Sequence, residues 1–288
     1  MNSTLATVSK ILRYSCVDGP GNRLVIFLQG CNFSCQACHN PHTIGICNHC
    51  GDCIPACPVN ALSLVDSLVE FDPQRCDQCD ACLDVCPISA NPMVSQYAVA
   101  DILALIYKHR PFLSGITVSG GEPTRQLQFL VDLFSAVKAD PELARITCFI
   151  DSNGHLGESG WAALLPVTDG VMLDIKSFRS QLHEDMTGSS NDRSLRSARI
   201  LYAAGKLYEL RFLLVPGKTD SDDELDQLAA FVGELGANLQ VRLNAFQHHG
   251  VRGPALNWEK MSEDGVNSAA DRLRAAGLSN VVTPAVYL

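Results

Sequence analysis

The stretch LVIFLQGCNFSCQACHNP at residues 24–41 places an apolar run directly before a cysteine-rich loop. The apolar run predicts a buried β-strand over 24–28. The loop carries Cys31, Cys35 and Cys38, spaced Cys-x3-Cys-x2-Cys. An iron–sulfur cube of four irons normally takes four thiolates, so a cube bound here keeps one iron open, as catalytic metal sites require. A zinc site that adds His39 is the alternative, but adjacent Cys38 and His39 can hardly both reach one tetrahedral ion.

Further apolar runs follow along the chain, each separated from the next by an amphipathic stretch. They predict strands over 116–118, 146–150, 171–175, 211–215 and 239–243, and VVT at 281–283 fits a further edge strand. Helices are expected near residues 95–109, 126–139, 158–165, 192–204, 221–235 and 262–276. Strict alternation of strand and helix implies parallel βαβ units, so the sequence predicts an α/β barrel or an open part of one.

A distinctive polar cluster follows or closes each predicted strand. These clusters are QGCNFSC, SGGEP, DSNG, LDIK, VPG and NAFQHHG, in chain order. Because the carboxyl ends of parallel strands share one face, where active sites are built, we expect the six segments to meet in one cleft.

Residues 39–94 break the alternation, since they hold eight cysteines and six prolines and no long helix. We interpret them as an insert on the loop face. The insert contains C-x2-C-x2-C-x3-C-P twice, and in this bacterial ferredoxin pattern the fourth cysteine of each copy ligates the other cluster. One predicted cluster therefore uses Cys47, Cys50, Cys53 and Cys86, and the other uses Cys76, Cys79, Cys82 and Cys57. A pair of zinc knuckles is the alternative. Cys16 and Cys148 are interpreted as structural.

Composition narrows the class of protein further. The 288 residues are 47% hydrophobic and 18% charged, as in a compact globular chain. A net charge of −9 argues against nucleic acid as a partner. No apolar run approaches the ~20 residues of a membrane span and no signal core is present, so we expect no membrane partner and a cytoplasmic protein. The cytoplasm is reducing, so the thirteen cysteines indicate metal ligation or reactivity and not a disulfide framework.

These motifs together resemble a known family. The three-cysteine loop with Asn40 and Pro41, the upstream DGPGNR at 18–23 and the cysteine-rich insert are similar to the glycyl radical enzyme activating enzymes of the radical S-adenosylmethionine (SAM) superfamily. These are relatives of pyruvate formate-lyase activase, and the YjjW-type activases resemble the chain most. The resemblance covers essentially the whole chain. It implies an incomplete (β/α)6 barrel made of residues 1–38 and 95–288, with a ferredoxin-like two-cluster domain inserted at 39–94.

The resemblance also implies cofactors and residue roles. Three [4Fe-4S] clusters are expected, and Cys31, Cys35 and Cys38 would hold the catalytic one, whose free iron binds SAM. Gly120, Gly121 and Glu122 match the GGE motif that contacts the SAM amino group. A monovalent cation, Na⁺ or K⁺, would lie beside the SAM carboxylate, at positions matched by Asp151, Ser152, Met172 and Asp174.

Three further positions are carried over from the family. Lys176 and Arg211 match polar residues near SAM, although either is alternatively a solvated or ion-paired charge. The family's loop histidine is replaced by Gln247, so its role passes to His248, or to His249 beside it.

The implied activity is reductive cleavage of SAM to a 5′-deoxyadenosyl radical. That radical would remove hydrogen from a glycine of a partner glycyl radical enzyme, with flavodoxin or ferredoxin as the electron donor. The cleft would admit a peptide loop between walls formed by residues 18–23 and by NAFQHHG. Two alternatives are a radical SAM enzyme acting on a small molecule and an electron-transfer protein.

Overall fold

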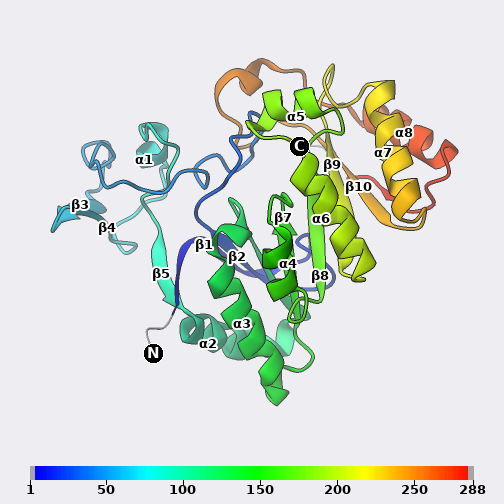
Figure 1. Cartoon of the computed structure of the whole chain (residues 1–288). Coiled ribbons are helices and arrows are strands. Elements are labelled where there is room, and N and C mark those ends of the chain that lie inside the picture. Colours follow the sequence, from blue (N-terminus) through cyan, green and yellow to red (C-terminus); the bar gives the residue numbers. More distant parts are fainter. Residues whose placement is uncertain (1–3, 285–288) are drawn as a thin grey trace. The chain divides into compact units, whose positions relative to one another are not determined.

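The computed structural model describes residues 4–284 and divides the chain into two compact units (Figure 1). Unit 1 combines the described residues up to Asn32 with Asn40–Ile146, and unit 2 combines Phe33–His39 with the described residues from Thr147 onward. Within residues 4–284, no helix has both the length and the apolar character that a membrane span needs.

The sheet of unit 1 has the strand order β6–β2–β1–β5. The buried strand β2 (Arg23–Leu28) runs parallel to β6 (Gly115–Gly120) and antiparallel to β1 (Leu5–Ser15). The short strand β5 (Ser95–Ala98) pairs antiparallel with the start of β1. The predicted strands over 24–28 and 116–118 are therefore confirmed. The sequence analysis missed β1, whose residues are mostly half-buried or exposed and form no continuous apolar run.

The helices of unit 1 are α2 (Val99–His109) and α3 (Leu127–Ala139), with the short 3₁₀ turns η1 (Arg110–Phe112), η2 (Pro123–Gln126) and η3 (Pro141–Leu143). The predicted helix over 95–109 was wrong at its start, because Ser95–Ala98 pair with β1. The Asp101 carboxylate accepts a hydrogen bond from the Ala98 N–H at 2.8 Å and so marks the true beginning of α2.

Unit 2 contains five parallel strands in the order β11–β10–β9–β8–β7. They are β7 (Thr147–Ser152), β8 (Gly170–Ile175), β9 (Leu207–Leu214), β10 (Gln240–Ala245) and β11 (Val281–Val282). All four core strands predicted in this part of the chain are confirmed, and so is the edge strand. The predicted parallel arrangement is confirmed for every strand pair of this unit.

The helices of unit 2 follow the predicted pattern, with two additions. The predicted ones are α4 (Glu158–Leu164), α6 (Asp192–Ala203), α7 (Asp222–Leu235) and α8 (Glu263–Ala275). The hydroxyls of Ser221 and Ser262 cap α7 and α8. The additions are α5 (Ser180–Thr187) and the turn η4 (Gly253–Asn257), which are too short and too polar to give a periodic signal.

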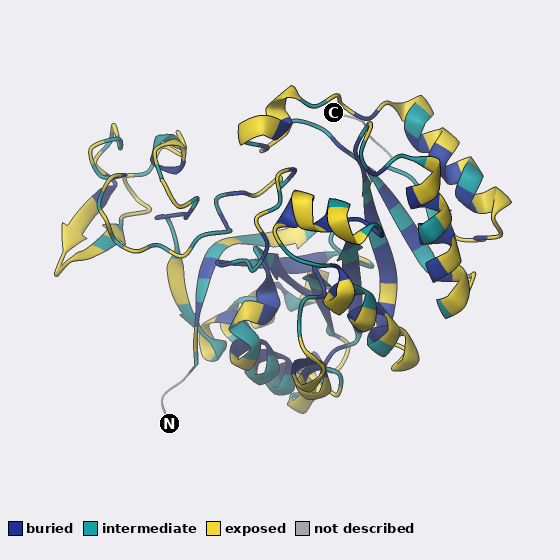
Figure 2. Cartoon of the chain, turned by 45° about the horizontal axis from the view of Figure 1, so that its top comes forward, coloured by how far each residue is buried: buried dark blue, intermediate teal, exposed yellow. Residues whose placement is uncertain are grey.

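The cysteine-repeat segment, residues 43–93, lies in unit 1 and has little regular structure. It contains the hairpin of β3 (Leu62–Val65) and β4 (Leu68–Phe71) and the single-turn helix α1 (Ala81–Asp84). Figure 2 shows that the hairpin is largely exposed. A buried hydrophobic cluster of the segment consists of Cys53, Leu62, Cys82 and Leu83, and Ala61 and Ala90 are also buried. So small a core points to stabilisation by a further element, such as a bound metal group.

Candidate functional site

Cys31 follows β2 in unit 1 and is held by main-chain hydrogen bonds. The N–H groups of Gly30 and Cys31 donate to the carbonyl oxygens of Thr43 and Ile44, at 2.8 and 2.9 Å. Thr43 in turn bridges Ala90, and the Gly45 N–H donates to the Ser89 carbonyl. The two ends of the cysteine-repeat segment therefore meet beside Cys31 and fix its backbone.

Gly120 and Gly121 end β6 against the backbone that precedes Cys31. Gly120 has φ +126°, and a Cβ there would lie 2.2 Å from the Leu28 carbonyl oxygen. A Cβ on Gly121 would lie 2.5 Å from the Gly30 oxygen. Sequence reasoning explained these glycines by the approach of a ligand, but missed that the chain's own backbone already leaves no room for a side chain.

The carboxylate of Glu122 is 1% exposed and oriented by its own turn. The Glu122 N–H donates to the Gly30 oxygen at 2.9 Å. Its Oε1 accepts hydrogen bonds from the Thr124 N–H and hydroxyl, at 3.1 and 2.5 Å. These bonds hold an acidic side chain at the carboxyl end of β6, next to the two glycines.

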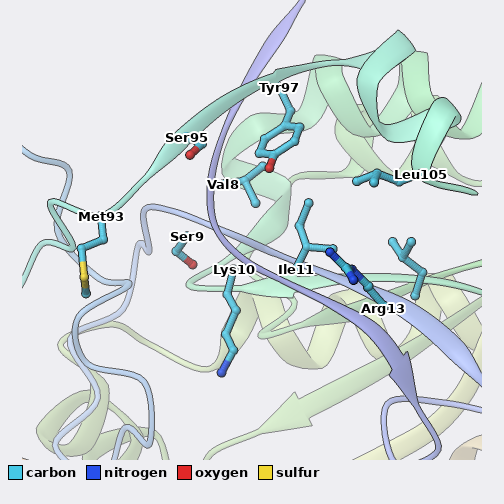
Figure 3. A pocket seen from close by; sticks show the side chains of 10 residues that line it. Val8, Ser9, Lys10, Ile11, Arg13, Met93, Ser95, Tyr97 and Leu105 are labelled. Carbon is cyan, nitrogen blue, oxygen red and sulfur yellow. The ribbon is translucent and has the colours of Figure 1, made fainter. Parts of the chain in front are cut away.

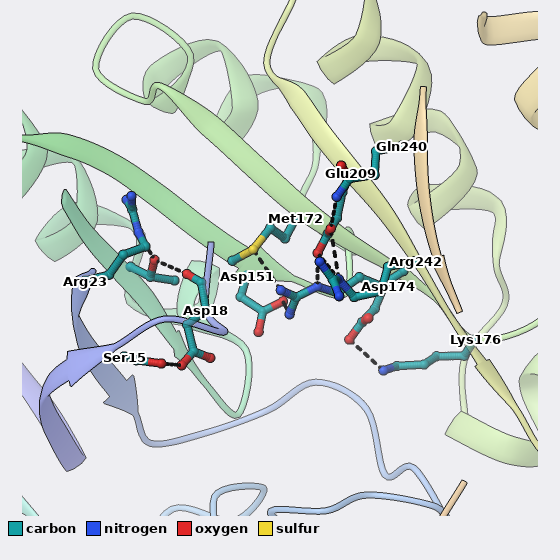
Figure 4. Close-up of polar contacts among 12 residues, drawn as sticks. Ser15, Asp18, Arg23, Asp151, Met172, Asp174, Lys176, Glu209, Gln240 and Arg242 are labelled. Carbon is teal, nitrogen blue, oxygen red and sulfur yellow. Dashed lines mark hydrogen bonds and ion pairs between the residues drawn. The ribbon is translucent and has the colours of Figure 1, made fainter. Parts of the chain in front are cut away.

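The DGPGNR loop joins β1 to β2 and is tied to the middle of β6. The fully buried Arg23 guanidinium donates from Nε to the Thr117 hydroxyl at 2.7 Å, and that hydroxyl donates to the Asp18 carbonyl at 2.6 Å. The Asp18 carboxylate accepts a hydrogen bond from the Ser15 hydroxyl (Figure 4). Arg23 therefore has a structural role. Asp18 begins the same loop and is only half-buried, so part of its surface is accessible to solvent.

Cys35 and Cys38 belong to unit 2, where the end of α5 supports their loop. The N–H groups of Ser34 and Gln36 donate to the carbonyl oxygens of Thr187 and Met186, at 2.9 and 3.0 Å. Phe33 is buried against the edges of the His155 and His183 rings. The sequence analysis missed this support because it did not predict α5. All three cysteines of the motif are partly exposed.

Lys176 and Asp174 form an ion pair of 2.8 Å at the end of β8. Burial lowers the pKa of Lys176, but the Asp174 carboxylate and then the Cys35 thiol outweigh it, so the net shift is upward. Lys176 is therefore a fixed cation near the cysteine loop.

Arg211 on β9 contacts two of the residues predicted to bind a cation, Asp151 and Met172, which Figure 4 labels. Its guanidinium lies 3.2 Å from the Asp151 carboxylate and 2.8 Å from the Met172 sulfur. Burial lowers the pKa of Arg211, but Asp151 and Glu209 raise it by more. Ser152 is buried, and its hydroxyl accepts a hydrogen bond from the Gly154 N–H at 3.0 Å. Both carboxylates of the predicted cation site thus already face a cationic side chain.

Glu209 is a buried carboxylate that the sequence analysis missed. It is 1% exposed, and it accepts hydrogen bonds from Arg211, Arg242 and Gln240 at 2.6, 3.0 and 2.5 Å. The sequence does contain a signal for this contact. Side chains two residues apart on a strand share one face, so Glu209 and Arg211 lie on the same face of β9. Gln240 and Arg242 are their register partners on β10.

The loop after β10 packs against His39, next to Cys38. The His39 ring hydrogen-bonds the Gln247 backbone, and burial lowers its pKa. A Cβ on Gly250, at φ +72°, would lie 2.1 Å from the His39 oxygen. The His248 ring uses Nε2 to bond the Trp258 carbonyl at 2.8 Å. His249 is exposed.

Two cavities in the cysteine-repeat segment are each lined by four of its cysteines. The first cavity is lined by Cys47, Cys50, Cys53 and Cys86. The second cavity is lined by Cys57, Cys76, Cys79 and Cys82. The structure therefore brings together the two ligand sets that the spacing predicts, each with its fourth cysteine from the other copy.

The two copies of the repeat have matching backbones. The N–H groups of His49 and Gln78 each donate to a cysteine sulfur at 3.4 Å, and both residues have φ near +60°. The N–H groups of Ala61 and Ala90 donate to the sulfurs of Cys57 and Cys86, at 3.2 and 3.3 Å. Hydrogen bonds to sulfur are one of the means by which proteins tune iron–sulfur groups.

The donor set suits an iron–sulfur group in both cavities. Burial, and after it the neighbouring cysteines, raises the pKa of the Cys53 thiol and raises that of Cys82 to about 11. Four crowded thiols favour a positively charged metal group that stabilises their thiolates. The sulfurs surround a space and do not converge on a point. Among residues 4–284, no three His, Cys, Asp or Glu side chains are placed to hold a single metal ion.

The two leftover cysteines differ from each other. Cys148 is fully buried in β7, as expected for a core residue. Cys16 is exposed and so, unlike Cys148, is not a core residue.

Comparisons with known proteins decide the family. Residues 25–232 match the radical SAM superfamily. The pyruvate formate-lyase-activating enzyme of Streptococcus mutans is 32% identical over 229 residues, which cover 77% of this chain and 70% of the relative. The benzylsuccinate synthase activating enzyme of Thauera aromatica is 32% identical over 251 residues, covering 80% and 75%. The chain belongs to the glycyl radical enzyme activating enzymes of the radical SAM superfamily.

The fold of this activase is also found in a solved structure. A radical SAM methyltransferase from Sphaerobacter thermophilus superposes with a TM-score of 0.55 at 14% identity, over 98% of this chain and 77% of that one. The predicted family and enzyme class are confirmed, and neither of the two alternative functions is supported. Membership of this family implies SAM and a [4Fe-4S] cluster as cofactors. It also implies a glycyl radical enzyme as the protein substrate.

Proposed function

We propose that this activase cleaves SAM reductively at the cysteine loop and uses the 5′-deoxyadenosyl radical to remove hydrogen from a glycine Cα. One electron and one SAM yield methionine, 5′-deoxyadenosine and a glycyl radical on the partner enzyme. The observation that carries the proposal is the Cys31, Cys35 and Cys38 loop, which offers three thiols and keeps them partly exposed.

The chain's own residues have assigned tasks in this proposal. Cys31, Cys35 and Cys38 hold the catalytic cluster, which when bound supplies the electron and an open iron for SAM. Gly120, Gly121 and Glu122 receive the SAM amino group, and the buried carboxylate offsets its charge.

Lys176, Arg211 and His248 complete the proposed SAM-binding set. Lys176 and Arg211 keep their charge because carboxylates beside them raise their pKa values. They are therefore suited to pairing with the SAM carboxylate. His248 contributes its Nδ1, since its Nε2 is bonded to Trp258.

A monovalent cation at Asp151, Ser152, Met172 and Asp174 belongs to the same proposal. Na⁺ or K⁺, which take oxygen ligands, would have to displace Arg211 from the Asp151 carboxylate, because these two groups are already in contact. Binding of the SAM carboxylate to Arg211 gives a reason for that displacement, since it offers the guanidinium a new anionic partner.

The domain arrangement that we propose has an incomplete (β/α)6 barrel over residues 1–38 and 95–288. A ferredoxin-like domain with two further [4Fe-4S] clusters is inserted at 39–94. The crosswise cysteine cavities and the matching copies support this assignment. We assign flavodoxin or ferredoxin as the electron donor, because each cluster accepts one electron at a time.

The test is anaerobic incubation of the reconstituted activase with SAM, a reductant and candidate glycyl radical enzymes. The proposal predicts a glycine-centred radical in the electron paramagnetic resonance spectrum of the partner, together with stoichiometric 5′-deoxyadenosine. Cys35→Ala is expected to give neither product. Cleavage of SAM to 5′-deoxyadenosine with the hydrogen atom taken from a small molecule, and with no protein radical on any candidate, would contradict the proposal.

A further inference from the structure

A groove in unit 1 lies beside β1, β5 and α2 (Figure 3). Val8, Tyr97 and Leu105 supply apolar lining, and the exposed cations Lys10 and Arg13 stand on its β1 side. Met93 and Ser95 close its other side. These residues are called the docking groove below.

The docking groove follows the free edge of β1. β5 pairs only with Leu5–Val8, whereas β1 continues to Ser15 with β2 on its other side. From Ser9 onward, the described residues place no strand beside this edge. An unpaired strand edge is a surface that a protein partner can use.

The charge of the docking groove is positive, in contrast to its surroundings. No acidic residue lines it, and neither Lys10 nor Arg13 forms an ion pair within residues 4–284. On α2, Asp101 lies one turn before Leu105, with its carboxylate bonded to the Ala98 N–H, and Lys108 lies one turn after it. The groove therefore has two uncompensated cations ready to meet an anionic surface.

The neighbouring cysteine-repeat segment is strongly acidic. Residues 43–93 carry seven Asp and Glu residues against a single Arg75. An acidic partner is repelled over most of that segment and attracted at the docking groove. Such a contrast steers a partner to one position and suppresses others.

Met93 joins the docking groove to the second cysteine cavity. Its side chain lines both hollows, and its sulfur lies 3.8 Å from the Cys76 sulfur. A protein seated in the groove is therefore adjacent to the cavity of Cys57, Cys76, Cys79 and Cys82. The first cavity is different, because it is lined by Ile88 and Ala90, next to the bridge that leads to Cys31.

We propose that the docking groove binds a small acidic one-electron carrier protein, and that electrons enter at the second cavity. This inference rests on the proposed function, in which the four cysteines of that cavity hold a redox group. One electron leaves the carrier, which is oxidised by one unit, and enters that group, which is reduced by one unit. No atom is transferred.

The test measures binding of a purified acidic flavodoxin to the reconstituted activase by isothermal titration calorimetry. Lys10→Glu/Arg13→Glu is expected to weaken binding at least tenfold, and added salt is expected to weaken binding of the native chain. The matched control is Lys206→Glu/Lys260→Glu, which makes the same charge change at side chains with no ion pair among the described residues. It is expected to bind within twofold of the native chain.

Equal affinity of the groove variant and the native chain would overturn the inference, and so would equal weakening by both variants. Loss of affinity for the glycyl radical enzyme alone would also overturn it, since the groove would then bind the protein substrate. Dithionite-driven cleavage of SAM needs no carrier protein, so it is expected to survive in the groove variant. If the native chain does not cleave SAM with dithionite, that result would contradict the proposed function and not the docking groove.

Discussion

Cys86 lines the same cavity as Cys53, although the two residues belong to different copies of the cysteine repeat. The Ala90 N–H donates to the Cys86 sulfur, and Ala90 also bridges Thr43. The cysteine that completes the first cavity is thus anchored beside the backbone that holds Cys31. This relationship connects the repeat to Cys31 within unit 1.

Each cavity takes its fourth cysteine from the other copy of the repeat, and this grouping predicts which cysteine variants behave alike. Cys86→Ala and Cys47→Ala are expected to lose the same cluster, about four of roughly twelve irons, because both thiols line the first cavity. Iron analysis and the electron paramagnetic resonance spectrum of the reduced protein check this expectation. Cys76→Ala is the comparison, since it removes a ligand of the second cavity. If Cys86→Ala resembles Cys76→Ala instead, each repeat binds its own cluster and the grouping is wrong.

Substitution of glycine by alanine is expected to have opposite effects on the free energy of unfolding at two positions. Gly120→Ala is expected to lower the free energy of unfolding by roughly 2–4 kcal/mol, because its φ is +126° and its Cβ would strike Leu28. Gly233→Ala, in the exposed part of α7 with no atom near the new Cβ, is expected to raise it by about 0.5–1 kcal/mol. Anaerobic urea unfolding measures both. A neutral Gly120→Ala would show that the loop after β6 moves freely.

Glu209 is expected to stabilise unit 2 through Arg211 and Arg242. Glu209→Gln should lower the free energy of unfolding by roughly 3 kcal/mol, because it leaves two guanidinium groups without their buried carboxylate. Glu234→Gln is the control, since its pair with Arg199 is exposed and is worth less than about 1 kcal/mol. Similar losses from both variants would contradict the importance given to the buried network.

His183 predicts a loss of stability in acid. Burial lowers its pKa; its Nδ1 bonds the Ser189 carbonyl, and its buried Nε2 has no hydrogen-bond partner among the described residues. The unfolded chain therefore binds a proton more readily than the folded chain, so stability falls as the pH drops below about 6.5 toward the folded pKa. Unfolding at pH 7.5 and 5.5 should show a smaller loss for His183→Asn than for the native chain. An equal loss in the two proteins would assign the acid sensitivity to other groups.

Much of the fold was predictable because local signals decided it. The six predicted core strands are short, mainly apolar runs, and each is followed or closed by polar residues, so their positions needed no long-range information. Ser95–Ala98 show the opposite case, since these residues continue a helical pattern and become a strand only by pairing with β1. Helix α5 was missed because its eight residues are mostly polar and show no clear helical periodicity of apolar side chains.

The candidate site also combines features that local sequence decides with features that contacts between distant residues decide. The cysteine sets follow from spacing, because ligand spacing is a local property of the chain. The Glu209–Arg211–Asp151 network depends on the register of β9 with its neighbours, and the steric need for Gly120 depends on the backbone of Leu28. Neither can be read from one stretch of sequence.

Anaerobic reaction of the reconstituted protein with SAM and dithionite tests the central claim most directly. The account predicts 5′-deoxyadenosine and methionine from the native chain and from Cys16→Ala, whose thiol lies outside the three cysteine sets. It predicts no product from Cys35→Ala. Zinc in place of iron at the cysteine loop, or equal product from Cys35→Ala and the native chain, would contradict the account.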